Sequence, residues 1–166
     1  DLRRPTVHNY FDVPREAGLS EVLAGKYLMR AVIRPVAAGL DVVTAGSMIA
    51  DPTRAIEQPE LAQYIEDLRQ EYRYIIVDCP PVLVCSEPIT LSLITDSTLL
   101  VVRAWRTQQR LVTDAVGVLG RGRIMGIVLN DGIDASKQYL DYGYYGYRPD
   151  IEAKKAAAFA KVTSGN

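Results

Sequence analysis

The sequence has few residues of the kinds that mark specialised protein classes. Its 166 residues include two cysteines, one histidine and one tryptophan, and the formal net charge is -1. Two cysteines without a cluster of histidines indicate reduced thiols rather than a disulfide framework or a zinc site. A near-neutral chain lacks the basic patch of nucleic-acid-binding domains, so we expect no nucleic-acid partner. No apolar run is long enough to span a membrane, and the composition favours a soluble domain with one core.

A run of β-branched apolar residues ends in one carboxylate, Asp78, and two prolines follow it. Residues 74–81 read Tyr-Ile-Ile-Val-Asp-Cys-Pro-Pro, which predicts a buried strand that stops at Asp78. Open parallel sheets bind their ligands at the carboxyl ends of their strands. A buried carboxylate there needs a cation or a hydrogen-bond partner, and the hydrated Mg²⁺ of a nucleotide is a common one. The alternative is an Asp that caps the following turn.

Segments that suit strands alternate along the chain with segments that suit helices. This alternation predicts an α/β fold with a doubly wound, mostly parallel sheet. The run at 98–102 is apolar on both faces, as expected of a strand covered by helices on both sides. Asn130 follows the last strand and reaches the same carboxyl edge as Asp78. The expected strands are 42–45, 74–78, 98–102 and 124–129, and the expected helices are 18–25, 59–68, 86–94 and 107–119.

Half of the ten tyrosines lie within nine positions near the end of the chain. Gly143 and Gly146 separate them, which argues against a buried strand. Flexible glycines between phenols suit a segment that enters a neighbouring active site in several registers, and each added phosphate would bring about -1.5 to -2 charge. The alternative is a sticky aromatic surface or a low-complexity tail. The tyrosines are Tyr139, Tyr142, Tyr144, Tyr145 and Tyr147.

Five segments follow one another along the chain, at 1–5, 18–25, 75–81, 99–103 and 126–130. In this order they resemble the cytoplasmic domain of the bacterial tyrosine kinases, the Wzc-like proteins that control capsule and exopolysaccharide polymerisation and export. The resemblance spans residues 1 to 147, and the Arg-Arg-Pro run and the tyrosine-rich tail distinguish it from the MinD/ParA-type ATPases of the same fold. It implies ATP and Mg²⁺ as cofactors and a ring-like homo-oligomer in which the tail enters a neighbouring subunit. It also implies a membrane-embedded co-polymerase segment, fused or separate, and a cytoplasmic location at the inner membrane.

The resemblance also assigns roles to single residues. Asp78 corresponds to the Walker B acidic residue, and Asp1 to the second Asp of the Walker A′ motif, so both are expected on the Mg²⁺ side of the catalytic site. Arg3 corresponds to the Arg of that motif and is expected to bind nucleotide. Asn130 is at a position that commonly reads the nucleotide base, with a structural turn Asn as the open alternative. The five tail tyrosines correspond to autophosphorylation sites.

The Walker A loop of the family is absent from this sequence. The only Gly-Lys pair, Gly25-Lys26, is followed by Tyr27, so it does not match the P-loop pattern. ATP cannot be held in register for in-line transfer without the backbone N–H groups and the lysine of that loop. We therefore expect the P-loop strand to lie outside this sequence and this fragment alone to be inactive. A true pseudokinase is the alternative.

These observations predict three regions. Residues 1–134 are expected to form part of a P-loop kinase domain from Walker A′ onward, 135–150 the tyrosine-rich tail, and 151–166 a flexible end. The function that follows is a protein tyrosine autokinase in the intact protein. The alternatives are a MinD/ParA-type ATPase and a non-catalytic interaction module of a polysaccharide export system.

Overall fold

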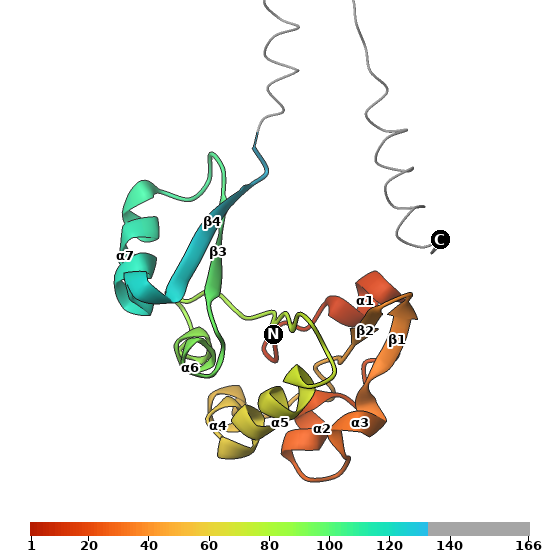
Figure 1. Ribbon diagram of the computed structural model, residues 1–166. Helices are drawn as coiled ribbons and strands as arrows, with labels where there is room; N and C mark the ends of the chain where they lie inside the picture. Colours follow the sequence, from red (N-terminus) through yellow and green to blue (C-terminus); the bar gives the residue numbers. More distant parts are fainter. Residues whose placement is uncertain (133–166) are drawn as a thin grey trace, which may run out of the picture.

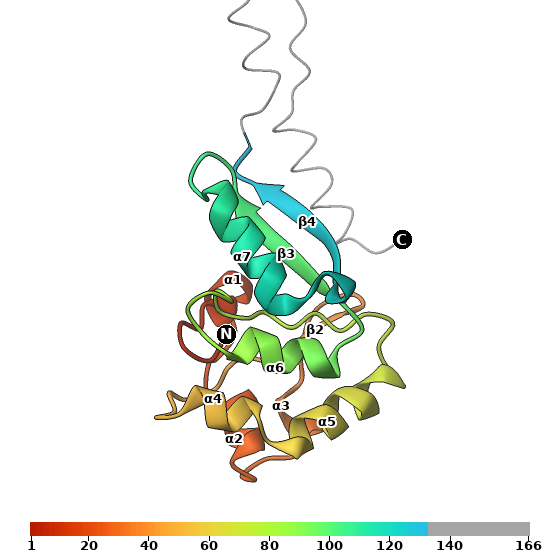
Figure 2. The same ribbon diagram turned by 90° about the vertical axis from the view of Figure 1, so that its left-hand side faces the viewer.

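Strands β3 (Thr98–Arg103) and β4 (Ile124–Asn130) form a parallel pair in the computed structural model, which describes residues 1–132. Helix α7 (Gln109–Leu119) and a short 3-10 helix, η1 (Arg121–Arg123), connect the two strands. Figures 1 and 2 show α7 lying along this pair. A parallel pair needs such a crossover connection, and the predictions of both strands and of the helix between them are confirmed.

The prediction that the 98–102 strand is covered on both sides is wrong for the described residues. Val102 is buried in β3, but Leu99 and Val101 are each more than half exposed. In β4, Met125 and Leu129 are likewise more than half exposed. Apolar side chains in a strand predict that another element buries them, but they do not show which element it is. Among residues 1–132, helix α7 covers only part of the β3–β4 pair.

The remaining elements form a second layer beside the strand pair (Figure 1). Helix α5 begins at Pro59, as predicted, because proline fits the first helical position. Helix α6 also lies where the sequence predicted it. Three short helices and a hairpin were not predicted. The elements of this layer are α1 (Val7–Phe11), α2 (Leu19–Leu23), α3 (Met29–Val32), β1 (Arg34–Ala37), β2 (Leu40–Val42), α4 (Pro52–Ile56), α5 (Pro59–Arg69) and α6 (Glu87–Ile94).

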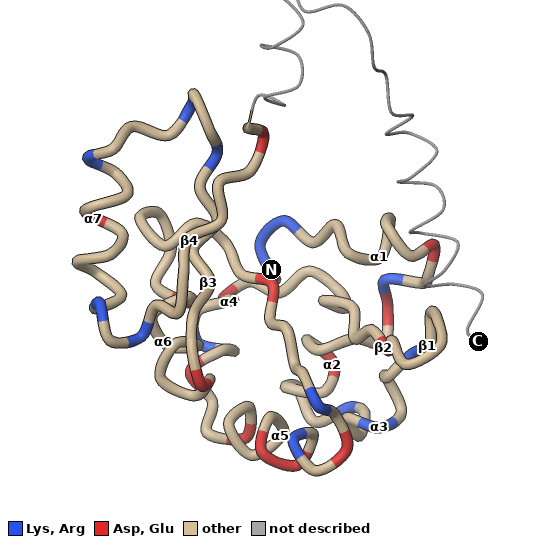
Figure 3. The backbone as a smooth tube through the Cα atoms, turned by 45° about the horizontal axis from the view of Figure 1, so that its top comes forward, with Lys and Arg blue, Asp and Glu red and all other residues tan. Residues whose placement is uncertain are grey.

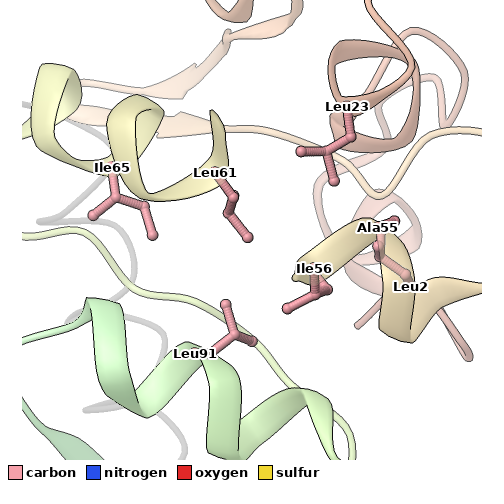
Figure 4. Packing of buried hydrophobic residues seen from close by; sticks show 7 residues of the cluster. All are labelled: Leu2, Leu23, Ala55, Ile56, Leu61, Ile65 and Leu91. Carbon is pink, nitrogen blue, oxygen red and sulfur yellow. The ribbon is translucent and has the colours of Figure 1, made fainter. Parts of the chain in front are cut away.

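One hydrophobic cluster joins four helices of this layer to the start of the chain (Figure 4). Leu2 packs in this cluster, so the first residues are held against the helices instead of extending into solvent. Burying each such side chain contributes about 1.5–3 kcal/mol relative to leaving it exposed. The cluster consists of Leu2, Leu23, Ala55, Ile56, Leu61, Ile65 and Leu91.

Two predicted strands differ from the structure. The segment expected as a strand at 42–45 contributes only Val42, to β2, which pairs antiparallel with β1. The carbonyls of Thr44 and Ala45 instead accept the N–H groups of Leu19 and Ser20 at the start of α2, at 2.8 and 2.9 Å. A helix N-terminus leaves such N–H groups unpaired, and they compete successfully for these carbonyls.

The segment at 74–78 is not a strand in the described part of the chain. A strand requires a ladder of backbone hydrogen bonds with a neighbour. Within residues 1–132, the backbone partner found for this segment is Asp1, whose nitrogen donates to the carbonyl oxygen of Asp78. One such contact orders the end of the segment without creating a ladder.

A buried carboxylate, Glu21, fixes the loop that leads into α2. Its two oxygens accept the N–H groups of Gly18, at 2.8 Å, and Ser47, at 3.0 Å. Burial raises the pKa of Glu21, but the hydrogen bonds from Gly18 and Ser47 outweigh it and lower the pKa to about 2. The charged carboxylate therefore stabilises this loop.

Replacing Glu21 by Gln is expected to change the pH dependence of stability in the intact protein. Because the folded pKa, about 2, lies below the ordinary value of 4.5, the contribution is present above pH 4.5 and is lost as the pH falls toward 2. The shift corresponds to about 3 kcal/mol. Urea unfolding at several pH values should show the variant less stable at pH 7 and similar to the parent near pH 2. A constant difference at all pH values would contradict the assignment.

Candidate active site

Asp1 and Asp78 meet although they are 77 positions apart in the sequence. The nitrogen of Asp1 donates to the carbonyl oxygen of Asp78 at 2.7 Å and lies 3.7 Å from its Oδ2. In Figure 1 the N-terminus lies between the β3–β4 pair and helix α4. The structure thus brings the backbone nitrogen of Asp1, one of the two residues that the sequence assigned to the Mg²⁺ side of the site, against the other, Asp78.

The two carboxylates have different environments. The side chain of Asp78 is 59% exposed and that of Asp1 is 15% exposed. The prediction that Asp78 is buried is therefore wrong, because the segment that carries it joins no sheet within residues 1–132. Asp1 Oδ1 accepts the N–H groups of Arg3 and Arg4 at 2.8 and 3.0 Å, which closes a turn at the start of the chain.

Arg3 lies in a side-chain network beside this turn. Its Nε donates to Glu87 Oε1 at 2.8 Å, and its Nη2 donates to Thr53 Oγ1 at 3.0 Å. The Thr53 hydroxyl in turn donates to Glu87 Oε1 at 3.1 Å. Figure 3 shows the acidic and basic positions next to each other at the N-terminus. The sequence reasoning did not identify Glu87 or Thr53 as part of the site.

The electrostatics of this network favour the ion pair. Burial raises the pKa of Glu87, but hydrogen bonds from its own backbone N–H, from Arg3 and from Thr53 together lower it below its ordinary value. The same pairing, mainly the hydrogen bond to Glu87, raises the pKa of Arg3. Both side chains are therefore charged at neutral pH.

Asn130 ends β4, at the carboxyl edge of the parallel pair as predicted. Its side-chain Oδ1 accepts the N–H of Asp131 at 2.9 Å, and its carbonyl accepts the N–H of Ala104 at 2.8 Å. Arg103, its neighbour in the sheet register, pairs with Asp131. Within residues 1–132, no hydrogen bond or ion pair links Asn130 to Asp1, Arg3 or Asp78.

The remaining predicted site residues lie outside the described residues. These are Tyr139, Tyr142, Tyr144, Tyr145 and Tyr147, together with the proposed regions 135–150 and 151–166.

The Gly25-Lys26 pair does not form a phosphate-binding loop. Gly25 has a left-handed φ of 70° at the end of α2, and the N–H of Lys26 donates to the carbonyl of Glu21 at 2.9 Å. These are features of a helix C-terminus, where a left-handed glycine allows the last carbonyls to be satisfied. The backbone N–H of Lys26 is therefore already bonded at the end of the helix. This agrees with the prediction that the Gly25-Lys26 pair does not belong to a P-loop.

The carboxylates near the N-terminus are too few for a metal ion whose ligands all come from the protein, but they suit Mg²⁺. No cluster of three or more His, Cys, Asp or Glu side chains that could hold a metal ion occurs among the residues that the structure describes. Mg²⁺ is usually bound by one or two carboxylates, with waters and substrate phosphates completing its shell. Asp1 and Asp78, with Arg3 two residues after Asp1, are the candidates for such ligands among the residues that the structure describes.

Comparisons with known proteins identify the family more narrowly. No family model matches the chain. The putative tyrosine-protein kinase CapB of Staphylococcus aureus is 31% identical over 150 residues, which cover 88% of this chain and 65% of CapB. The tyrosine-protein kinase etk of Escherichia coli K12 is 34% identical over 145 residues, which cover 86% of this chain and 20% of etk. The chain thus spans less than two thirds of these relatives.

The solved structures agree with the sequence comparison. The kinase domain of VpsO matches with a TM-score of 0.73 and 30% identity, covering 78% of this chain and 66% of that one. The chain belongs to the bacterial tyrosine kinases, as the ordered segments predicted. None of the helices described in residues 1–132 is long and apolar enough to cross a membrane.

Proposed function

We propose that the chain is part of an ATP-dependent protein tyrosine autokinase that regulates exopolysaccharide or capsule polymerisation and export. The contact between Asp1 and Asp78 carries this proposal, because the backbone nitrogen of Asp1 bonds to Asp78 and so brings two residues with carboxylate side chains, the ligands that Mg-nucleotide uses, next to each other. The names of the relatives, which are tyrosine-protein kinases, support the same activity.

The roles of the site residues follow from their chemistry. Asp1 and Asp78 would hold the hydrated Mg²⁺, which neutralises charge on the phosphates when bound. Arg3 retains donors for a phosphate oxygen, because a guanidinium has five N–H groups and Glu87 and Thr53 account for two. Asn130 would face the base. A carboxylate of this acidic cluster would accept the proton of the attacking phenol.

The architecture of the intact protein is part of the proposal. A doubly wound sheet that includes a P-loop strand from outside this sequence would cover the exposed apolar residues of β3 and β4. Residues 1–134 would then belong to the kinase domain and 135–150 to a tail that enters a neighbouring subunit of a homo-oligomeric ring. The partner would be a membrane-embedded polysaccharide co-polymerase segment, fused or separate, with this part in the cytoplasm at the inner membrane.

The intact protein, incubated with ATP labelled at the γ-phosphate, is expected to label the tail. Replacing the five tail tyrosines by Phe should remove most of the label, because the acceptor phenols are gone, while Mg-ADP binding measured by calorimetry stays unchanged. Tyr10→Phe is the matched control, since Tyr10 is 83% exposed and should keep full labelling. The substituted residues are Tyr139, Tyr142, Tyr144, Tyr145 and Tyr147.

Three outcomes would contradict the proposal or a part of it. Release of free phosphate without any tyrosine label would favour a MinD/ParA-type ATPase. Absence of nucleotide binding in the intact protein would favour a non-catalytic interaction module. Loss of both label and binding in the five-Phe variant would assign the tail a structural role instead of an acceptor role.

A further inference from the structure

Glu87 is a deeply buried carboxylate that follows the double proline after Asp78. It is 2% exposed and is the first residue of α6, whose other residues are mainly apolar. Buried carboxylates are rare unless they are paired. Its pairing with a residue 84 positions away, Arg3, indicates a role other than capping its own helix.

The contacts of Glu87 join three separate segments. Arg3 comes from the N-terminal turn, Thr53 from α4 and Glu87 from α6, and their three side chains form a closed set of hydrogen bonds of 2.8 to 3.1 Å. Arg3 is 42% exposed at its side chain whereas Glu87 is 3% exposed. The buried carboxylate is thus the fixed end of the pair, and the arginine extends from it toward the surface.

The second oxygen of Glu87 argues against a purely structural role. Oε2 is buried and has no hydrogen-bond partner among the described residues. A buried acceptor without a partner is unfavourable, and such groups in folded proteins call for an explanation. An apolar residue in this place would avoid that cost but would leave the Arg3 guanidinium without its charged partner.

The network reaches the site through the turn that Asp1 closes. The N–H groups of Arg3 and Arg4 hold Asp1 Oδ1, and the backbone nitrogen of Asp1 donates to the carbonyl oxygen of Asp78. Fixing the Arg3 guanidinium therefore fixes the turn and the direction of the Asp1 carboxylate. We propose that Glu87, with Thr53, is a positioning residue that orients Arg3 and the Asp1 turn for binding of Mg-nucleotide. This inference rests on the proposed function.

Glu87→Gln in the intact protein tests this role, because Gln keeps the shape and removes the charge. Supporting partners of metal-site ligands typically affect metal affinity or activity by about 10- to 100-fold. We expect the Mg²⁺ concentration for half-maximal Mg-ADP binding to rise by about tenfold or more, with a matching fall in tyrosine labelling. Glu66→Gln, which removes an exposed carboxylate that pairs with Arg69 on α5, is the control and should leave both unchanged.

A double-mutant cycle separates positioning from simple destabilisation. If Glu87 acts through Arg3, adding Glu87→Gln to Arg3→Met should cause little further loss, because coupled residues are not additive. Thr53→Val removes only the bridging hydroxyl and should give a smaller change in the same direction. It also tests the proposal if Glu87→Gln lowers the melting temperature too far for binding measurements.

The outcomes distinguish this inference from the proposed function. An unchanged Mg²⁺ requirement in Glu87→Gln and in Thr53→Val would overturn the positioning role, as would fully additive losses with Arg3→Met. If the parent protein binds Mg-ADP but labels no tyrosine, the kinase proposal fails. The Mg²⁺ requirement of the variants then still decides the role of Glu87.

Discussion

Asp78→Asn in the intact protein is expected to lower tyrosine labelling by about 10²-fold or more. The substitution keeps the size of the side chain but removes the negative charge that Mg²⁺ prefers among its oxygen ligands. Initial rates of label transfer at saturating ATP measure the effect. A variant that labels its tail at the normal rate would show that Asp78 is not on the metal side of the site.

The fold should survive this substitution. Asp78 contacts Asp1 through its backbone carbonyl, which Asn retains, and its side chain is 59% exposed. The melting temperature should therefore change little. Asp114→Asn is the matched control, because Asp114 is also half exposed and pairs only loosely with Arg110 at 3.9 Å. It should leave both labelling and melting temperature at the level of the parent.

Long elements with clear boundaries could be predicted from the sequence. Strands β3 and β4 are apolar runs, α5 and α6 carry prolines in their first turn, and Gly120 ends α7 with a φ of 83°. The β1–β2 hairpin was missed because Pro35 lies within it, and proline normally argues against a strand. Helices α1, α3 and α4 have only four or five residues, too few to show a period.

The start of α7 shows how local signals can mislead. The sequence predicted a helix that starts at Thr107, but Gln108 is the N-cap residue and the helix begins at Gln109. The hydroxyl of Thr107 instead accepts the N–H of Arg103 at 3.2 Å, so it closes the loop after β3. A threonine hydroxyl near a helix start can accept an N–H from the first turn of the helix or from the preceding loop. The sequence alone does not show which of the two is nearer.

The sequence indicated only some residues of the candidate site, again because a local signal does not show which partner a side chain contacts. Asp1 and Asp78 were assigned because each belongs to a recognisable motif, and in the structure the backbone nitrogen of Asp1 donates to the carbonyl oxygen of Asp78. Glu87 lies in the first turn of the helix predicted at 86–94, and nothing in the sequence connected it with the N-terminal segment. A carboxylate at the start of a helix is compatible with a fully exposed or a fully buried side chain. Only the packing of α6 against the N-terminal segment reveals the pairing with Arg3.

Gly46→Ala is expected to lower the free energy of unfolding by about 3 kcal/mol. Gly46 has a φ of 83°, a conformation that costs alanine about 1–2 kcal/mol. An added Cβ would also collide with the side chains of Ser20 and Glu21. Both side chains are buried, and Glu21 cannot move aside without breaking its hydrogen bonds to Gly18 and Ser47.

Gly39→Ala separates the two causes, because Gly39 has a similar φ of 72° and open space around the added Cβ. Urea unfolding of the intact protein should therefore show a loss of about 1–2 kcal/mol for Gly39→Ala and a clearly larger one for Gly46→Ala. Glu21→Ala removes one of the colliding groups, so its combination with Gly46→Ala should be less than additive. Equal losses for the two glycine variants would mean that the loop yields at Gly46, and that Glu21 holds it less rigidly than its hydrogen bonds to Gly18 and Ser47 indicate.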